Sequence, residues 1–287
     1  MQALVLDALG APLKLKEVAK PSIGPTDVLV EVSACGVGLT VVNLLATPGR
    51  VRQYPRIPGH EIAGRVVAKG SEVSHVQVGS RVTSHFYLTC GQCRHCRSGR
   101  ETLCLSSPGQ VGQAIDGGYA QFVALPARNV VAIPDGVSDL DAAVGCDAIA
   151  TPYHACHEEA RVKPGDSVLV VGCGGDGMNV VQGARLCGAT KIIAADIVPA
   201  KLDWARDFGA TDGVNAQGDA LTRAVLERTG GIGVDHAFVC IDPPATLLPA
   251  FRATTKGGNV VVTALTPDTV TEIRIPDRKS TRLNSSH

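Results

Sequence analysis

The sequence predicts an α/β protein in which a β-rich unit is followed by a doubly wound parallel sheet. From Lys163 onward, short apolar runs alternate with helix-length segments, which is typical of a parallel sheet with right-handed crossovers. Residues 1–35 instead hold short apolar runs separated by proline and glycine, with no helix of ordinary length. With 287 residues, the chain is long enough to form two hydrophobic cores.

The first part of the chain reads as a β-rich barrel or roll. The strands that we expect there are Ala3–Leu6, Leu13–Val18, Val28–Val32 and Gly117–Leu125. Asp139–Glu159 reads as helix, with a break near Thr151 and Pro152, and this segment marks the expected boundary. We therefore expect one domain over residues 1–149 and a second over residues 150–276.

A glycine-rich turn is the strongest signal in the second part. The apolar run Val168–Val171 leads directly into glycines with G-x-G-x-x-G spacing and one extra glycine, namely Gly172, Gly174, Gly175 and Gly177. A helix-length segment follows, and a second apolar run, Ile192–Ala195, ends at Asp196. In this context the first glycines allow a tight turn and close approach to a pyrophosphate, which the helix N-terminus then binds. The stretch predicts a dinucleotide-binding turn.

An acidic residue selects the dinucleotide. Asp196 lies about 20 residues beyond the glycines, where a carboxylate accepts hydrogen bonds from the adenosine ribose and repels a 2′-phosphate. NAD is therefore favoured over NADP, and Lys201 is placed to reach the same ribose. Asp176 is unusual because it brings a negative charge into the loop, where an apolar residue would suit the cofactor better.

After Asp196 the alternation of strands and helices continues. Helices are expected at Pro199–Phe208, Leu221–Thr229 and Leu247–Thr255, and strands at Val234–Cys240 and Val260–Leu265, with a turn at Lys256–Gly258 before the last strand.

Charge and composition exclude several classes of partner. Lysine plus arginine equals aspartate plus glutamate at 27 each, so no basic field favours nucleic acid. No apolar run is long enough to span a bilayer, and no signal peptide is evident. Ten cysteines without an export signal favour metal binding in a reducing compartment, and we expect a cytoplasmic protein that acts on a small molecule.

Four of these cysteines form a sharp metal signal. Cys90, Cys93, Cys96 and Cys104 have C-x2-C-x2-C-x7-C spacing within residues 90–104. Four thiolates in tight loops suit tetrahedral zinc with no open position, which is typical of a structural site, and an iron–sulfur cluster is the main alternative. The arginines of this loop would lower the thiol pKa values.

The last eleven residues read DRKSTRLNSSH, similar to a translated sequencing adapter. We expect residues 277–287 to be an artefactual tail outside the fold, and the chain to be a C-terminally truncated fragment.

In their order along the chain, these features resemble the zinc-containing medium-chain alcohol dehydrogenases. The resemblance covers residues 1–276 and is carried by G-H-E at Gly59–Glu61, the four-cysteine lobe, DAIATPYHA at residues 147–155 and the G-x-G-G-x-G loop. It implies a GroES-like catalytic domain, an incomplete Rossmann domain, and an active site between them. It also implies interconversion of an alcohol and an aldehyde or ketone by hydride exchange with NAD, in a homo-oligomeric parent protein.

The catalytic zinc site departs from this family pattern. Gly38 stands where the family has a cysteine ligand, Val41 where it has a supporting acid, and Asn43 where it has a relay histidine. The resemblance leaves His60, Glu61 and Asp147 as ligands, with Cys146 as an alternative and Cys35 as a remote one. Thr40 matches the hydroxyl residue that relays the proton.

Three functions therefore compete. The first is zinc-assisted, NAD-dependent alcohol dehydrogenation by Thr40, His60, Glu61 and Asp147. The second is a related carbonyl or enoyl reduction without catalytic zinc, which the loss of the ligand at Gly38 favours. The third is a non-catalytic NAD-binding fragment.

Overall fold

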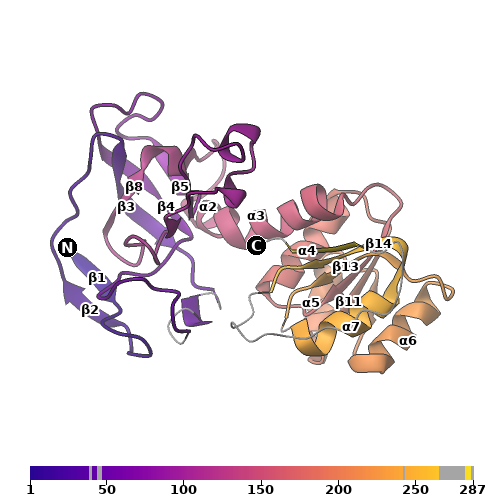
Figure 1. Cartoon of the computed structure of the whole chain (residues 1–287). Helices are drawn as coiled ribbons and strands as arrows, with labels where there is room; N and C mark the ends of the chain where they lie inside the picture. The colour runs from indigo at the N-terminus through magenta and orange to yellow at the C-terminus, as the bar shows by residue number, and fades with distance from the viewer. Residues whose placement is uncertain (39–40, 44–46, 242, 265–281, 286–287) are drawn as a thin grey trace. The chain divides into compact units, whose positions relative to one another are not determined.

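The first unit of the chain is β-rich and the second is a layered α/β unit, as Figure 1 shows. The computed structural model describes residues 1–38, 41–43, 47–241, 243–264 and 282–285. The two units are Met1–Asp147 and Ala148–His287. The predicted fold class is confirmed.

An antiparallel sheet of five strands, in the order β8-β3-β4-β5-β9, forms the centre of the first unit. Its strands are β3 (Asp27–Cys35), β4 (Ile62–Lys69), β5 (Arg81–Ser84), β8 (Phe122–Pro126) and β9 (Val130–Ala132). Smaller antiparallel pairs are β1 (Gln2–Val5) with β2 (Lys14–Glu17), and β6 (Tyr87–Leu88) with β7 (Gly109–Gln110). Short 3-10 turns lie at η1 (Cys96–Ser98), η2 (Glu101–Leu103) and η3 (Ala127–Asn129).

The core of this unit is built from alternating residues of the central strands. Val28 and Val30 of β3 are fully buried, and they pack with Ile62 and Val66 of β4. Because side chains alternate across a strand, the residues between them face the other side. The polar neighbours His60 and Glu61 directly precede β4, so the burial of β4 fixes where their backbone lies.

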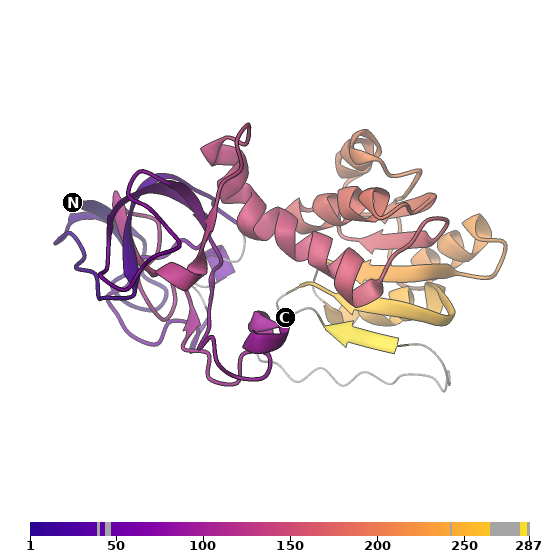
Figure 2. The ribbon, with the colours of Figure 1, turned by 90° about the horizontal axis from the view of Figure 1, so that it is seen from above.

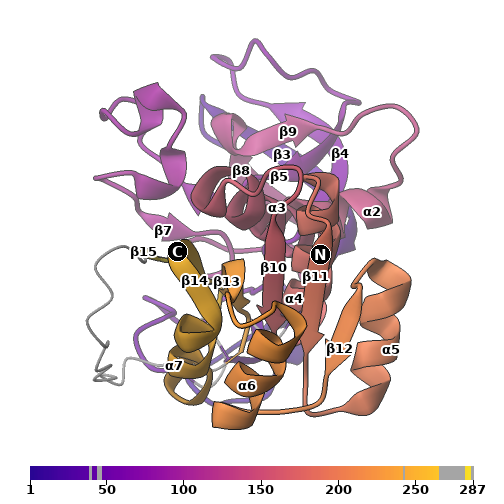
Figure 3. The ribbon, with the colours of Figure 1, turned by 90° about the vertical axis from the view of Figure 1, so that its right-hand side faces the viewer.

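The second unit contains a parallel sheet whose order is β12-β11-β10-β13-β14-β15 (Figure 3). Its strands are β10 (Ser167–Val171), β11 (Lys191–Ala195), β12 (Asp212–Val214), β13 (Val234–Val239), β14 (Thr254–Val262) and β15 (Arg282–Ser285). Its longer helices are α4 (Gly175–Leu186), α5 (Pro199–Phe208), α6 (Gly218–Arg228) and α7 (Pro243–Ala253). The order reverses direction at β10, which has β11 on one side and β13 on the other.

Helices cover both faces of this sheet. Val168 and Val170 of β10 pack into one core with residues of α4 and α5. Leu169 and Val171 face the opposite side and pack into a second core with residues of α6 and α7. A strand buried on both faces explains why β10 reads as an unbroken apolar run.

Two strands differ from the prediction. The three-residue strand β12 is not predicted, because it holds only one buried apolar side chain, Val214. The expected turn at residues 256–258 lies instead within β14, which pairs with β13 at Val234 and again at His236 with an irregular register between them. Gly257, at a φ of 83°, absorbs this irregularity as a bulge.

The expected helix over residues 139–159 is helical without the predicted break. It consists of α2 (Asp139–Val144), the π-helical η4 (Gly145–Ile149), α3 (Ala150–His154) and the π-helical η5 (Ala155–Ala160). Pro152 cannot donate a backbone hydrogen bond and crowds the preceding turn. The wider π turn directly before α3 accommodates this proline without ending the helix.

Part of the segment that we expected to be a tail has a place in the sheet. Arg282–Ser285 forms β15, which pairs in parallel with Asn259–Val262 of β14 and is the yellow arrow at the sheet edge in Figure 2. An open sheet edge offers unpaired N–H and C=O groups to any segment that reaches it.

Candidate metal centres and dinucleotide loop

The four cysteines of residues 90–104 converge on one point. Their sulfur atoms all lie within 4.8 Å of one another. The Sγ atom of Cys96 lies 3.9 Å from that of Cys90 and 3.5 Å from that of Cys93. A tetrahedral zinc with Zn–S bonds of about 2.3 Å holds its sulfurs about 3.8 Å apart. The residues present therefore fit a closed zinc site.

Backbone amides prepare this lobe to hold thiolates. The N–H groups of Cys96 and Leu105 hydrogen-bond the Cys93 sulfur and lower the pKa of Cys93 to about 6. The N–H groups of Gln92 and Cys93 likewise lower the pKa of Cys90. The backbone N–H groups of the tight turns thus make the largest contribution to lowering these pKa values, whereas the sequence analysis expected the arginines of the loop to do so.

The second predicted ligand set also comes together. His60, Glu61 and Asp147 each offer a donor atom, and these atoms lie within 4.8 Å of one another. His60 Nε2 lies 2.9 Å from Asp147 Oδ2. His60 and Glu61 are buried, each 7% exposed. Among the described residues, this group and the four-cysteine lobe are the two that fit a metal ion.

Glycines and aromatic rings fix the orientation of this cluster. A Cβ atom at Gly36 would lie 1.8 Å from Glu61 Oε2, so the Glu61 carboxylate fills the space above Gly36. Gly59 has a φ of 95°, which directs the chain into the cluster. The His60 ring contacts Phe86, with 5.0 Å between ring centroids. The Ser84 hydroxyl donates to the His60 carbonyl oxygen at 2.7 Å.

The alternative thiol ligands lie beside the cluster and outside it. The Cys146 sulfur faces the carbonyl oxygens of Ala143 and His60, at 3.2 and 3.9 Å. Burial raises the pKa of Cys146 to about 11, and the charges of Glu61 and Asp147 contribute to this increase. Burial also raises the pKa of Cys35, with further contributions from Cys146 and Glu61. An ion would have to displace a proton to bind either thiol.

The loop that departs from the family pattern is described in part. Gly38 contributes no side-chain donor, and Val41 is buried at 3% exposure where the family has a supporting acid. Thr40, the predicted relay residue, lies outside the described residues.

The glycine-rich turn connects β10 to α4 as predicted. Gly172 adopts a φ of 93°, and a Cβ atom at Gly177 would lie 1.8 Å from the Gly172 carbonyl oxygen. Both positions therefore require glycine. Cβ atoms at Gly174 and Gly175 would meet nothing within 4 Å, so the backbone at the start of α4 is open to a ligand. An open, amide-rich helix N-terminus fits the pyrophosphate of a dinucleotide.

Asp196 ties this turn to β11. Its Oδ2 atom accepts a hydrogen bond from the Cys173 N–H at 2.9 Å, and its Oδ1 atom accepts one from the Val198 N–H at 2.9 Å. Lys201 Nζ lies 3.7 Å from Asp196 Oδ2. Each carboxylate oxygen has two lone pairs, so Asp196 keeps acceptor capacity for ribose hydroxyls.

The structure adds apolar residues that sequence reasoning did not single out. Ile197 and Val198 are exposed directly after Asp196, at 65% and 43%. Ile241, which follows β13, packs against Gly172, because a Cβ atom there would lie 2.3 Å from the Ile241 side chain. Ile197 and Val198 could have been noticed in the sequence as an apolar pair between Asp196 and Pro199. The contact of Ile241 is long-range and leaves no local signal.

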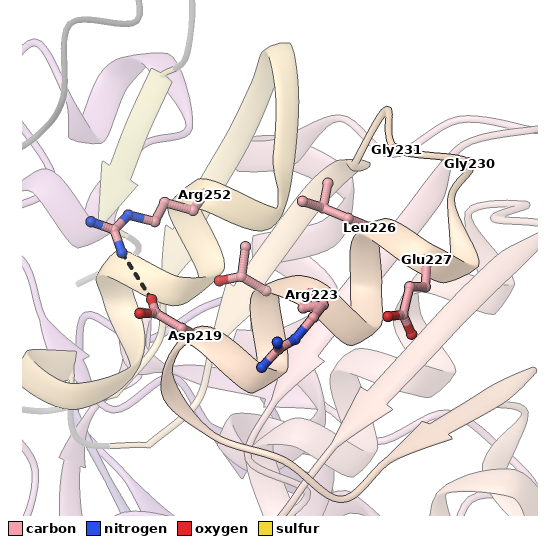
Figure 4. A pocket seen from close by; sticks show the side chains of 8 residues that line it. Asp219, Arg223, Leu226, Glu227, Gly230, Gly231 and Arg252 are labelled. Carbon is pink, nitrogen blue, oxygen red and sulfur yellow. Dashed lines mark hydrogen bonds and ion pairs between the residues drawn. The ribbon is translucent and has the colours of Figure 1, made fainter.

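An open groove of about 940 Å³ lies on the second unit, away from these residues (Figure 4). It is lined mainly by charged and polar residues of α6 and α7, including Arg223, Glu227 and an ion pair of 2.9 Å between Arg252 and Asp219. None of the predicted site residues lines it.

Two family models match the chain. The alcohol dehydrogenase GroES-like domain matches residues 24–135, and the zinc-binding dehydrogenase model matches residues 175–286. An alcohol dehydrogenase from Geobacillus stearothermophilus is 37% identical over 279 residues, which cover 96% of this chain and 80% of that protein. An L-threonine 3-dehydrogenase from Francisella philomiragia is 39% identical over 231 residues, covering 78% of this chain and 65% of its own length.

Solved structures agree with these matches. AibC superimposes with a TM-score of 0.90 and 32% identity, covering 99% of this chain and 80% of its own. The alcohol dehydrogenase TADH from Thermus sp. ATN1 gives a TM-score of 0.89 and 28% identity, covering 99% and 84%. A zinc-binding dehydrogenase from Sinorhizobium meliloti, bound to NADP, is 30% identical, with a TM-score of 0.87 and coverage of 98% and 83%.

The chain spans less than two thirds of the threonine dehydrogenases that it matches, but four fifths of the Geobacillus alcohol dehydrogenase. The fold of the chain agrees with that of these solved structures. The chain belongs to the zinc-containing medium-chain alcohol dehydrogenases, a family of oxidoreductases that use zinc and a nicotinamide dinucleotide.

Proposed function

We propose that this protein interconverts an alcohol and an aldehyde or ketone with NAD, using a divalent metal bound by His60, Glu61 and Asp147. The observation that carries the proposal is the convergence of these three donors within 4.8 Å in the first unit, where His60 and Glu61 are buried. One imidazole and two carboxylates fit zinc, although harder donors without a thiolate select zinc over other divalent metals less strongly.

The residues of the chain prepare this chemistry. When bound, the metal supplies a Lewis acid for the substrate oxygen. The Asp147 carboxylate accepts a hydrogen bond from the His60 Nε2–H, and this bond holds the imidazole ring toward the cluster. Glu61 is held in place by its contact with Gly36. We assign Thr40 the relay of the substrate proton, because it matches the family's hydroxyl residue.

The second unit supplies the dinucleotide site in this proposal. Gly172, Gly174, Gly175 and Gly177 admit the pyrophosphate, and Asp196 with Lys201 binds the adenosine ribose. The carboxylate of Asp196 supports a preference for NAD over NADP, because a 2′-phosphate would approach a buried negative charge. Cys90, Cys93, Cys96 and Cys104 hold a structural zinc.

Metal content tests the catalytic site directly. We expect two zinc ions per chain by inductively coupled plasma mass spectrometry, one in His60→Ala, and one in Cys104→Ser. Alcohol oxidation, followed as NADH absorbance over a panel of alcohols, should fall strongly in His60→Ala and in chelated protein. A single zinc ion in the wild-type chain, unchanged by His60→Ala, would contradict the proposal.

A second candidate function is carbonyl or enoyl reduction without catalytic zinc. The absence of a ligand at Gly38 and the direct contact of 2.9 Å between His60 and Asp147 favour it. In that case His60 and Asp147 would bind the substrate oxygen by hydrogen bonds. NADH-dependent reduction of a carbonyl or enoyl substrate that persists in chelated protein would identify this function.

We further propose that the protein is cytoplasmic and that it forms a homo-oligomer. None of the ten cysteines, all of which lie in the described residues, forms a disulfide, and this supports a reducing compartment. Within the described parts of the chain, no helix has the length and apolar character needed to cross a bilayer. Fractionation of the source cells and light scattering of the purified protein measure these two properties.

A further inference from the structure

The unusual charge in the glycine-rich loop has a defined place. Asp176 is the second residue of α4, half-buried between Gly175 and Gly177. Gly177 lies directly against the Gly172 carbonyl oxygen, so the first turn of α4 is held against the end of β10. Asp176 therefore belongs to a rigid part of the loop.

The sheet order separates the two halves of a bound dinucleotide. Ligands of such sheets lie outside the carboxyl ends of the strands, where the order reverses, which here is at β10. Asp196 ends β11 on one side of β10 and marks the adenosine half. The nicotinamide half consequently lies on the other side, toward the carboxyl end of β13.

Asp176 is close to that other side. Cys240 directly follows β13, and its N–H donates to the Val171 carbonyl oxygen at 2.9 Å. Burial raises the pKa of the Cys240 thiol, and the negative charge of Asp176 raises it further. The next residue, Ile241, packs against Gly172, and Gly172 lies directly against Gly177. The start of α4, which carries Asp176, therefore lies beside the carboxyl end of β13.

We propose that Asp176 sets the relative affinity of the site for the two redox forms of NAD, favouring the oxidised form. The inference rests on the proposed dinucleotide site and goes beyond it. The nicotinamide ring is cationic in NAD⁺ and neutral in NADH, so a nearby carboxylate stabilises the first relative to the second. The pyrophosphate carries the same charge in both forms, so its repulsion cancels in the ratio of the two dissociation constants.

This preference biases the reaction of bound molecules toward carbonyl reduction. In that direction the C4–H bond of NADH breaks, its electron pair forms a C–H bond at the carbonyl carbon, and the carbonyl oxygen gains a proton. The dinucleotide is oxidised to NAD⁺, which is the form that the Asp176 carboxylate stabilises.

Titration calorimetry with NAD⁺ and with NADH tests the proposal on the whole chain. We expect Asp176→Asn to lower the ratio Kd(NADH)/Kd(NAD⁺) by about three- to tenfold, since a carboxylate several ångströms from a charge in a partly hydrated site acts with this strength. Asp176→Glu keeps the charge and should restore most of the ratio. Asp207→Asn, an exposed position on α5, removes the same charge elsewhere and should leave the ratio unchanged.

The other results overturn the proposal in distinguishable ways. If Asp176→Asn increases the affinity for NAD⁺ and NADH equally, Asp176 acts on the pyrophosphate and the inference alone is wrong. If both forms bind and nothing changes, Asp176 has no electrostatic role and the inference again fails alone. If the folded wild-type chain binds neither form, the proposed dinucleotide site is wrong and the inference falls with it.

Discussion

His236 Nε2 lies 2.9 Å from Asp166 Oδ2, and both side chains are buried in the second unit. The Asn259 amide nitrogen lies 3.1 Å from His236 Nδ1 and 3.1 Å from the Ala160 carbonyl oxygen. The amide therefore donates to both, which leaves His236 Nε2 as the donor to Asp166. This network joins β13 and β14 to the segments that precede β10.

We predict that His236→Ala destabilises the second unit by roughly 2–4 kcal/mol, because it leaves a buried carboxylate and a buried amide without their partner. Urea denaturation followed by circular dichroism measures the loss. His157→Ala is the matched control, since its side chain is 54% exposed and its removal should cost less than about 0.5 kcal/mol. Equal effects of the two substitutions would show that the network contributes nothing.

Gly36→Ala should weaken the metal site of the first unit while leaving the four-cysteine lobe intact. The added methyl group would overlap the Glu61 carboxylate and displace it. We expect zinc affinity at this site to fall by tenfold or more, the range seen when a metal ligand is disoriented. Competition with a chromophoric chelator measures it, and Gly175→Ala in the second unit, whose Cβ meets nothing within 4 Å, is the control.

Asp196→Asn should reduce the discrimination against NADP. The substitution removes the negative charge that a 2′-phosphate would meet, and it weakens the hydrogen bonds from the Cys173 and Val198 N–H groups. We expect NADH to bind about tenfold more weakly and NADPH to lose less affinity or gain some. Fluorescence titration with each dinucleotide gives the two constants. An unchanged ratio would be evidence that the ribose lies elsewhere.

Arg81 and Asp139 give the first unit a pH-dependent contribution. Hydrogen bonds from the Arg81 guanidinium lower the pKa of Asp139 below its usual 3.8. A lowered pKa stabilises the folded state above pH 3.8, and this stabilisation is lost as the pH falls through the folded-state value.

We therefore expect Asp139→Asn to cost up to about 1 kcal/mol at pH 7, the upper range for a partly exposed pair. The difference from the wild type should shrink as the pH falls below 3.8 and through the folded-state pKa, because the carboxyl is then protonated in both the folded and the unfolded protein. Denaturation at several pH values measures it, with the exposed Asp135→Asn as control. A difference that stays constant with pH would mean that the ion pair is not its source.

The elements that could be predicted from the sequence are those with a strong local pattern. The helix Pro199–Phe208 has the predicted bounds, because Pro199 starts it and Gly209, at a φ of 116°, ends it. The strand β10 is an apolar run bounded by polar residues and glycine. In both cases local sequence and tertiary burial agree.

The elements that were missed depend on distant partners. The strand β12 exists because it pairs with β11, and the bulge of β14 exists because its pairing with β13 resumes at His236. The pair His60 and Glu61 is visible in the sequence, whereas the preference for Asp147 over Cys146 as their partner came from the family resemblance, which left Cys146 as an alternative. That choice requires knowing how the helical segment turns.

The π-helical turn Gly145–Ile149 decides the chemistry of the metal site. Consecutive side chains on a helix point about 100° apart. If the sequence shifted by one residue along the helix, the neighbouring side chain would therefore point to the place that Asp147 now occupies. In this chain the phase directs the Asp147 oxygen to His60 and turns the Cys146 sulfur toward backbone carbonyls. Removing one residue between Asp147 and α3, with α3 kept in place, would bring Cys146 to the position of Asp147 and exchange a hard oxygen donor for a soft sulfur donor. The metal preference of the proposed site therefore depends on the register of this helical segment.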